Sequence, residues 1–219
     1  ASGANLNDLS SGTYTVTAVD ENGCTMKASK TLIDPDVVKA SITIISDFHG
    51  QPLSCNGASD GHIAASASGG TNSFEFRWNT GSNENELSGI GAGIYHVVAT
   101  DANGCEAGDT ATVIDPDPVK AMITSVSDYN GYGVRCQAGN DGFIEASGIG
   151  GTGNYTFHWQ ETNETTFRSF DLPKGTYTVK VADENGCHDS QSQEITEPLL
   201  LTLQVKDSTN ISCFNGNDG

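Results

Sequence analysis

Hydrophobic and polar residues alternate over short runs throughout the chain. In the run 74–78 aromatic residues take every second position, and the run 155–159 repeats this arrangement. A period of two over four to eight residues predicts β-strands, and no stretch shows the 3.6-residue period of an amphipathic helix. Trp78 and Trp159 are in phase with the other apolar residues of their runs. The alternation therefore predicts an all-β protein with both tryptophans in its core, where they are not available to stack on sugars.

The strand pattern recurs about every 81 residues, together with three landmark motifs. The motifs are Gly-x-Tyr-x-Val at 12–16, 93–97 and 175–179; Asp-x-Asn-Gly-Cys at 20–24, 101–105 and 183–187; and a Cys…Asp-Gly run at 55–61, 136–142 and 213–219. A repeat of this length can bury its own core, so we expect separate domains in tandem and not the coils of a solenoid.

Acidic residues followed by proline mark the joints between repeats, at Asp34-Pro35, Asp115-Pro116 and Glu197-Pro198. Proline cannot donate to a sheet and keeps the preceding residue extended. The expected domains are the C-terminal part of a repeat (1–35), two complete repeats (36–116 and 117–198) and the N-terminal part of another (199–219). Because neither end coincides with a joint, we expect the chain to be a piece of a longer protein.

Each complete repeat is expected to form an immunoglobulin-like β-sandwich of six or seven strands. In the first complete repeat the strands are predicted near 39–47, 62–68, 74–79, 85–90, 94–101 and 107–114. The Asn-Gly pair at 103–104 predicts the turn of the last hairpin. The tyrosine of Gly-x-Tyr is placed to bond back to the backbone upstream, as in the tyrosine corner of such sandwiches.

The chain has a formal net charge of −18, from 28 acidic and 10 basic residues. An acidic surface repels phosphate backbones, which argues against nucleic-acid binding. No hydrophobic run approaches the ~18 residues of a membrane span. The acidity is typical of a soluble extracellular surface. The alternative interpretation is that acidic clusters bind divalent cations.

Six cysteines recur at fixed positions, and none forms the C-x-x-C pair of a zinc site. Regular cysteines in small β-domains indicate disulfides and an oxidising compartment. Three alternatives are open. Pairing within repeats gives Cys55–Cys105 and Cys136–Cys187, pairing across repeats gives Cys24–Cys55, Cys105–Cys136 and Cys187–Cys213, and in the third alternative all six stay reduced.

We expect the bridges within repeats, because an even number of strands between two cysteines returns the chain to the same end of the sandwich. Four strands are predicted between Cys55 and Cys105, which places both cysteines at the same end. A fifth strand between them would place them at opposite ends and exclude the bond. Cys24 and Cys213 would then bond to partners outside this chain.

No motif for a nucleophile, a phosphate loop or a zinc protease occurs, so neither an enzymatic activity nor a cofactor is expected. Calcium is the one candidate ion, at recurring aspartates beside glycine: Asp60, Asp101, Asp141 and Asp183. Calcium needs six to eight oxygen ligands, and neither motif supplies them alone. Aspartate also forms local turns through nearby backbone amides, and we favour that role.

The order of motifs resembles the SprB-type repeat of gliding-motility adhesins on Bacteroidetes cell surfaces. In the first complete repeat the match comprises 55–61, Gly69-Gly70-Thr71, Trp78, 93–95 and 101–105. The second matches at 136–142, 150–152, Trp159, 175–177 and 183–187, but has Asp171-Leu172-Pro173 where the more typical form is Ser88-Gly89-Ile90. The resemblance implies export by the type IX system, and candidate O-glycosylation at Thr110 and Ser208.

The resemblance and the repeats together predict a structural and adhesive segment of a very large secreted adhesin. It would support gliding motility and attachment from the outer-membrane surface of the cell. Expected partners are neighbouring repeats, substratum or surface polysaccharide, and motility or secretion machinery reached through other regions. The alternatives are an array of carbohydrate-binding modules, for which Phe48 and Tyr129 are candidate exposed aromatics, and an enzyme whose catalytic domain lies elsewhere.

Overall fold

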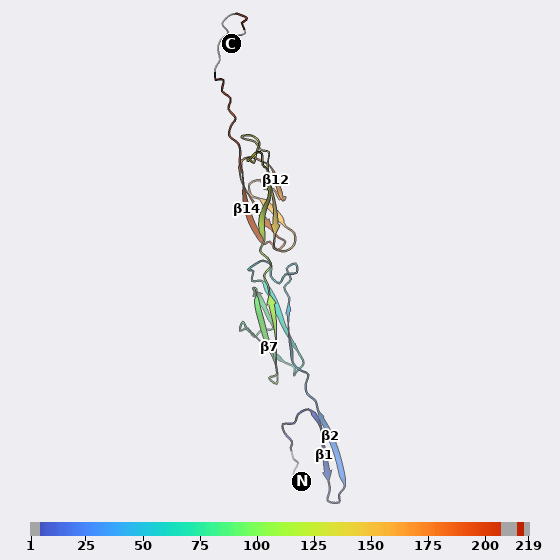
Figure 1. The fold of residues 1–219 in the computed structure, drawn as a ribbon. Coiled ribbons are helices and arrows are strands. Elements are labelled where there is room, and N and C mark those ends of the chain that lie inside the picture. The colour runs from blue at the N-terminus through green and yellow to red at the C-terminus, as the bar shows by residue number, and fades with distance from the viewer. Residues whose placement is uncertain (1–4, 207–213, 217–219) are drawn as a thin grey trace. The chain divides into compact units, whose positions relative to one another are not determined.

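The computed structural model describes residues 5–206 and 214–216, and every regular element among them is a β-strand (Figure 1). The chain forms two compact units. The first comprises the chain up to Asp47 and the segment Ser59–Ile114; the second comprises Phe48–Ala58 and the chain from Asp115 onward. The all-β prediction is confirmed, and Phe48–Ala58, here named the transferred loop, lies in the second unit although its flanking residues belong to the first.

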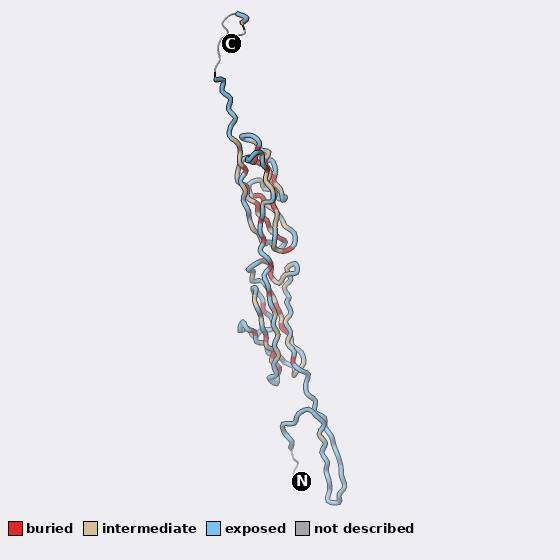
Figure 2. The backbone as a smooth tube through the Cα atoms, viewed as in Figure 1, coloured by how far each residue is buried: buried red, intermediate tan, exposed pale blue. Residues whose placement is uncertain are grey.

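The first unit contains an N-terminal hairpin and six further strands. The hairpin pairs β1 (Gly12–Val19) with β2 (Thr25–Leu32), and nearly all of it is exposed (Figure 2). The remaining strands form two three-stranded antiparallel sheets, in the orders β3-β4-β6 and β5-β7-β8. Their bounds are β3 (Lys39–Ile44), β4 (Gly61–Ser68), β5 (Phe74–Trp78), β6 (Glu86–Ile90), β7 (Gly93–Asp101) and β8 (Glu106–Val113). These agree closely with the bounds predicted from alternation.

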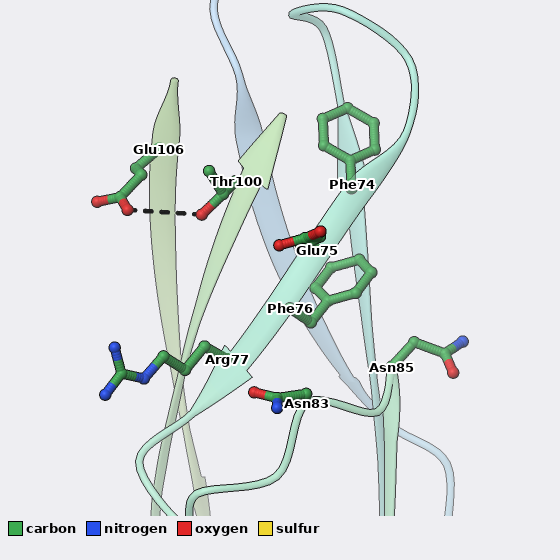
Figure 3. Close-up of a pocket in the computed structure, with 8 residues that line it drawn as sticks. All are labelled: Phe74, Glu75, Phe76, Arg77, Asn83, Asn85, Thr100 and Glu106. Carbon is green, nitrogen blue, oxygen red and sulfur yellow. Dashed lines mark hydrogen bonds between the residues drawn. The ribbon is translucent and has the colours of Figure 1, made fainter. Parts of the chain in front are cut away.

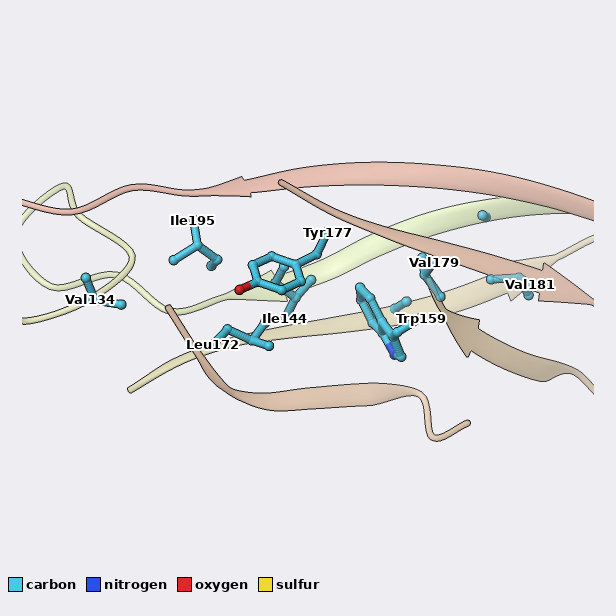
Figure 4. Close-up of a cluster of buried hydrophobic side chains, with 10 residues drawn as sticks. Val134, Ile144, Trp159, Leu172, Tyr177, Val179, Val181 and Ile195 are labelled. Carbon is cyan, nitrogen blue, oxygen red and sulfur yellow. The ribbon is translucent and has the colours of Figure 1, made fainter. Parts of the chain in front are cut away.

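The second unit repeats this arrangement, with sheets in the orders β9-β10-β12 and β11-β13-β14. Its strands are β9 (Lys120–Val126), β10 (Gly142–Ile149), β11 (Thr156–Trp159), β12 (Arg168–Leu172), β13 (Gly175–Ala182) and β14 (His188–Ile195). Buried side chains from both sheets meet in one cluster (Figure 4). Its members are Ala121, Val134, Ile144, Ala146, Trp159, Leu172, Tyr177, Val179, Val181 and Ile195. Two sheets packed on a shared apolar core form a sandwich.

Both tryptophans are buried, as the alternation predicted: Trp78 is 2% exposed and Trp159 is fully buried. Each indole N–H donates to a backbone carbonyl oxygen, that of Glu84 for Trp78 and that of Thr166 for Trp159. The ring therefore enters the core with its polar atom satisfied. Because they are buried, neither tryptophan is available at the surface to stack on a sugar ring.

The predicted tyrosine corner is present in all three copies of the Gly-x-Tyr motif. The hydroxyl of Tyr95 donates to the carbonyl of Gly91 at 2.9 Å, and that of Tyr177 donates to the carbonyl of Pro173 at 2.9 Å. Tyr14 does the same to Ser10 at 2.8 Å in the N-terminal hairpin. Each bond ties a strand to the turn that precedes it.

In each sandwich two short strands together run the distance from one end to the other that a long strand covers alone; we call one such passage a crossing. β5 pairs with the second half of β7, from Phe74↔Asp101 to Trp78↔Val97. β6 pairs with the first half of β4, from Gly61↔Ile90 to Ala64↔Glu86. The chain therefore travels halfway along one sheet as β5, changes sheet, and completes the same crossing as β6. In the second unit β11 and β12 divide the crossing in the same way.

Each unit consequently has an entrance end, where its first sandwich strand begins, and an exit end, where its last strand finishes. In the second unit the entrance end joins Asp117 to Gly151 and Thr152 to Asp183 through hydrogen bonds. The exit end joins Gly175 to Ile195 and Gly142 to Leu172 as strand partners. In the first unit the bond from Gly70 N to Asp36 and that from Thr71 N to Asp101 mark the corresponding entrance end.

Candidate functional site

A disulfide joins Cys55 of the transferred loop to Cys187, with 5.6 Å between their Cα atoms. Both residues belong to the second unit, and they are 132 positions apart in the sequence. The predicted pairs, Cys55–Cys105 and Cys136–Cys187, were wrong. Cys24, Cys105 and Cys136 are exposed free thiols among the described residues, whereas Cys213 lies outside them.

The error came from treating every strand as a full crossing of the sandwich. Four strands do separate the loop cysteine from the hairpin cysteine of one repeat, but two of them share a crossing. In the second unit Cys136 lies before β10, which starts at the exit end, and Cys187 lies at the entrance end. The eight residues of β10 span roughly 26 Å, whereas a disulfide needs Cα atoms within about 7 Å.

The hairpin that carries Cys187 is held by one buried carboxylate, that of Asp183, which is 4% exposed. Its Oδ1 accepts the backbone N–H groups of Asn185 at 3.0 Å and Cys187 at 2.9 Å. Its Oδ2 accepts the N–H of Thr152 at 2.9 Å, which ties the hairpin to the end of β10. These bonds satisfy amides that would otherwise be buried without partners, and they fix the position of the cysteine.

The hairpin 101–105 of the first unit has the same construction around Asp101, which is 5% exposed. Asp101 accepts the N–H groups of Asn103 at 2.9 Å, Cys105 at 2.8 Å and Thr71 at 2.8 Å. Gly104, at φ 83°, supplies the left-handed residue of the turn, a conformation that other residues adopt at a cost. Both aspartates therefore act as turn formers.

Polar contacts from the transferred loop surround the disulfide. The Asn185 amide nitrogen donates to the carbonyl of Ser54 at 3.2 Å, and that carbonyl also lies 3.1 Å from Cys187 Sγ. His49 reaches the same hairpin through Nδ1, 2.8 Å from Asn185 Oδ1, and through Nε2, 3.0 Å from Glu184 Oε2. Sequence reasoning missed these contacts. His49 is replaced by Asn130 in the second complete repeat, and Glu184 has an equivalent in Glu21 of the N-terminal hairpin but is replaced by Ala102 in the first complete repeat.

The other side of the transferred loop bonds to the residues that lead into the second unit. The N–H of Gly57 donates to Asp115 Oδ1 at 2.9 Å, and the side-chain amide of Asn56 donates to the carbonyl of Pro116 at 3.0 Å. The joint motif Asp-Pro is thus a docking site for the loop as well as an extended connection. The alternation of residue types gave no sign of this second role.

Hydrogen bonding lowers the pKa of Glu184 below its usual value. The principal cause is the side-chain amide of Asn154, followed by the backbone N–H of Asn154, and the nearby His49 acts in the same direction. Glu184 therefore stays ionised beside the hairpin over the ordinary range of pH. An ionised carboxylate retains its attraction for His49 when that imidazole is protonated.

The four aspartates proposed as calcium ligands are not gathered into one site. In the second unit Asp141 lies just before β10 and contacts Arg135, whereas Asp183 lies at the far end of that strand. Asp60 precedes β4 in the first unit, and Asp101 lies near the end of β4. Within residues 5–206 and 214–216, no cluster of three or more His, Cys, Asp or Glu side chains is arranged to hold a metal ion.

The candidate glycosylation residue Thr110 is exposed on β8, and its hydroxyl lies 3.0 Å from His96 Nδ1. Its neighbour Asp109 has a structural role, since Oδ2 accepts the N–H of Ile42 at 2.7 Å. Asp189 bonds to Ala121 in the same way in the second unit. The second candidate, Ser208, lies outside the described residues.

A shallow pocket of about 810 Å³ on the first unit involves both faces of β5 (Figure 3). Phe74 and Phe76 point to one side of the strand, and Arg77 points to the other, where Thr100 and Glu106 lie (Figure 3). The two phenylalanines are in phase with buried Trp78 and are themselves half-buried. Phe48 and Tyr129, the candidate exposed aromatics, are half-buried in loops closed by the bridges Phe48↔Gln51 and Tyr129↔Tyr132.

The carboxylate of Asp101 gives a testable dependence of stability on pH. Backbone N–H groups, first that of Thr71 and then that of Cys105, lower its pKa below the usual value near 3.8, and burial only partly opposes them. A carboxyl with a depressed folded pKa stabilises the fold above its unfolded pKa and loses that contribution as pH falls through the folded value.

As the pH is lowered from 3.8, we therefore expect the melting temperature of the wild-type chain to decrease more steeply than that of the variant Asp101→Asn. Thermal unfolding followed by circular dichroism from pH 6 to pH 2 would measure this difference. Parallel curves for the two proteins would show that the Asp101 hydrogen bonds do not favour its ionised form.

The fold has distant likenesses among solved structures. Fibronectin(III)-like modules of Clostridium thermocellum CbhA align at 17% identity, over 72% of this chain and 94% of that one, with a TM-score of 0.29. A C-terminal fragment of intimin in complex with the intimin-binding domain of its translocated receptor aligns at 13% identity, over 84% and 57%, with a TM-score of 0.31. Extracellular cadherin domains 1–4 of protocadherin gamma B7 align at 10% identity, over 89% and 66%, with a TM-score of 0.32.

None of the curated proteins matches the chain. In the part of the chain that the structure describes, no helix is long and apolar enough to cross a membrane. One family does match: residues 51–83, which run from the transferred loop through β4 and β5, fit the SprB repeat. The chain therefore carries a SprB-type repeat, at the position where the sequence motifs first indicated one.

Proposed function

We propose that this chain is a structural and adhesive segment of a large cell-surface adhesin. It would hold a distal region away from the cell and contact the substratum or a surface polysaccharide weakly at many points. Gliding motility, surface attachment and export by the type IX system are part of this proposal. The role is non-catalytic, and the motility and secretion machinery would act through other regions of the protein.

The disulfide between Cys55 and Cys187 is the observation that carries the proposal. It fixes the transferred loop within the second unit, although the chain on both sides of that loop belongs to the first. Tension on a surface protein would pass through this bond and bypass the residues between Cys55 and Cys187, because it follows the shortest covalent path. Disulfides persist in oxidising compartments outside the cytoplasm, which supports an extracellular location.

The matching SprB repeat also supports a cell-surface role. The alternative of a carbohydrate-binding module array needs an exposed aromatic platform at a repeated position. Trp78 and Trp159 are buried, and Phe48 and Tyr129 are half-buried, so the recurring aromatics do not supply one. Weak contacts repeated along many domains are the better explanation, because linked sites bind together far more strongly than each does alone.

Adhesion can be measured with the 219-residue chain coupled to beads that flow over glass or polysaccharide-coated surfaces. We expect retention under shear to rise more steeply than linearly with the number of chains per bead, since many weak contacts act together. Beads coated with bovine serum albumin at the same density are the control. If the coated beads are retained no better than the control beads, the adhesive part of the proposal is rejected. Saturable binding of one saccharide by single chains would favour the carbohydrate-binding alternative.

A further inference from the structure

The free thiol of Cys136 lies in a loop built like the transferred loop. Cys136 is the repeat equivalent of Cys55, and each cysteine carbonyl accepts the backbone N–H three residues later at 3.0 Å. The N–H two residues after each cysteine donates to the carboxylate of the joint motif at 2.9 Å: Gly57 to Asp115, and Ala138 to Glu197. The second loop therefore holds Cys136 against its joint as the first holds Cys55.

The free thiol of Cys105 lies in a hairpin built like that of Cys187. In each hairpin a buried aspartate accepts the cysteine N–H, at 2.8 Å for Cys105 and 2.9 Å for Cys187. Cys24 occupies the same place in the N-terminal hairpin, where its N–H donates to Asp20 at 2.8 Å. Cys105 and Cys136 are both exposed, so neither thiol is covered by its own unit.

We propose that Cys136 and Cys105 each form a disulfide equivalent to Cys55–Cys187, but with a neighbouring copy of this repeat. Cys136 bonds to the hairpin cysteine of a following copy of this repeat, and Cys105 bonds to the loop cysteine of a preceding copy. The loop cysteine lies at the exit end of a repeat and the hairpin cysteine at the entrance end, so consecutive repeats present complementary thiols. This inference concerns the linkage between repeats and does not depend on the adhesive role.

The disulfide is the shared element of the linkage, and the polar contacts around it vary. His49 Nε2 lies 3.0 Å from Glu184 Oε2 beside the observed bond, but Asn130 occupies the place of His49 in the second loop. Ala102 occupies the place of Glu184 in the first hairpin. Both cysteines and both turn-forming aspartates recur, so the proposed bonds would form without a contact like that between His49 and Glu184.

The bond forms by thiol–disulfide exchange with a disulfide oxidant, such as oxidised glutathione or a thiol oxidoreductase. One cysteine thiolate attacks the oxidant disulfide, forms a mixed disulfide and releases one thiol. The second cysteine thiolate attacks the protein sulfur of the mixed disulfide, which forms the Sγ–Sγ bond and releases the other thiol. Two cysteine thiols lose two electrons and two protons, and the oxidant disulfide takes up both as it becomes two thiols.

A chain extended by one repeat tests the pairing directly. A second copy of residues 117–198 is inserted after Pro198, so that it follows Glu-Pro as the original follows Asp115-Pro116. The protein is folded in a glutathione redox buffer, free thiols are alkylated, and disulfides are mapped by proteolysis and mass spectrometry without reduction. We expect a new bond from Cys136 to the hairpin cysteine of the added repeat, with Cys55–Cys187 retained and Cys24 and Cys105 alkylated.

The variant Cys136→Ser of the extended chain is the matched control. We expect the hairpin cysteine of the added repeat to become fully alkylated, while Cys55–Cys187 forms as before. The proposal is overturned if Cys136 is alkylated in the extended chain that lacks this substitution, or if Cys136 bonds to Cys105 in that chain. It is also overturned if the added hairpin cysteine bonds within its own repeat.

Disulfide mapping of the protein from its native cells gives an independent measurement that needs no added repeat. Thiols are blocked with N-ethylmaleimide at lysis, before any exchange can occur. We expect both Cys105 and Cys136 to resist this reagent until the protein is reduced. Recovery of either residue with the reagent attached would contradict the proposal.

Discussion

Pulled by its two ends, the chain should extend by roughly 460 Å more when the disulfide is reduced than when it is intact. The bond connects residues 132 positions apart, and an extended chain spans about 3.5 Å per residue. Tension follows the shortest covalent path, which runs to Cys55, across the sulfur atoms, and onward from Cys187. The strands from β4 to β13 lie between these cysteines and are removed from that path.

Single-molecule force spectroscopy with handles at both ends would measure the released length. The oxidised wild type should lack the long release that appears with a reducing agent or in Cys55→Ser. The variant Cys105→Ser is the control, because its thiol is free in this chain and the tension path is unchanged. Equal released lengths in oxidised and reduced protein would show that the disulfide does not carry the tension.

Truncation of the buried tryptophan in Trp159→Ala should lower the free energy of unfolding of the second unit by about 3–5 kcal/mol. Trp159 is fully buried and packs in the cluster that joins the two sheets. Its removal leaves a cavity and also takes away the indole N–H that bonds to the carbonyl of Thr166 at 3.0 Å. The cavity adds to the lost transfer free energy because a packed core relaxes only partly.

Urea unfolding followed by circular dichroism, with the disulfide intact in all proteins, would measure this loss. Phe167→Ala is the matched control, since that aromatic side chain is 57% exposed and should change stability by no more than ~0.5 kcal/mol. A loss for Trp159→Ala as small as that for Phe167→Ala would mean that the tryptophan does not organise the core.

Much of each sandwich could be predicted from local patterns in the sequence. The alternation in 74–78 and 155–159 located strands and put Trp78 and Trp159 in the core, because one face of a half-buried strand must be apolar. The Gly-x-Tyr motif predicted the tyrosine corner, whose bond spans only four residues. Aspartates 101 and 183 were correctly favoured as turn formers, because their hairpin bonds are also local.

The candidate site could not be derived in the same way, because it depends on where strands stop. Alternation around Phe76 and Leu87 indicates two strands but does not say that each covers only half of the sandwich. Treating both as full crossings placed Cys55 and Cys105 at the same end. The observed register divides one crossing between β5 and β6, which moves the two cysteines of a repeat to opposite ends.

The sequence by itself determined the all-β class, the repeat period, the strand positions and the recurrence of the cysteines, since these follow from side-chain periodicity and short motifs. Only the tertiary structure decided that the transferred loop belongs to the second unit and that Cys55 bonds to Cys187. The physical reason is distance: a disulfide forms only between Cα atoms a few ångströms apart. Proximity between residues 132 positions apart is set by the path of the whole chain, which no local pattern encodes.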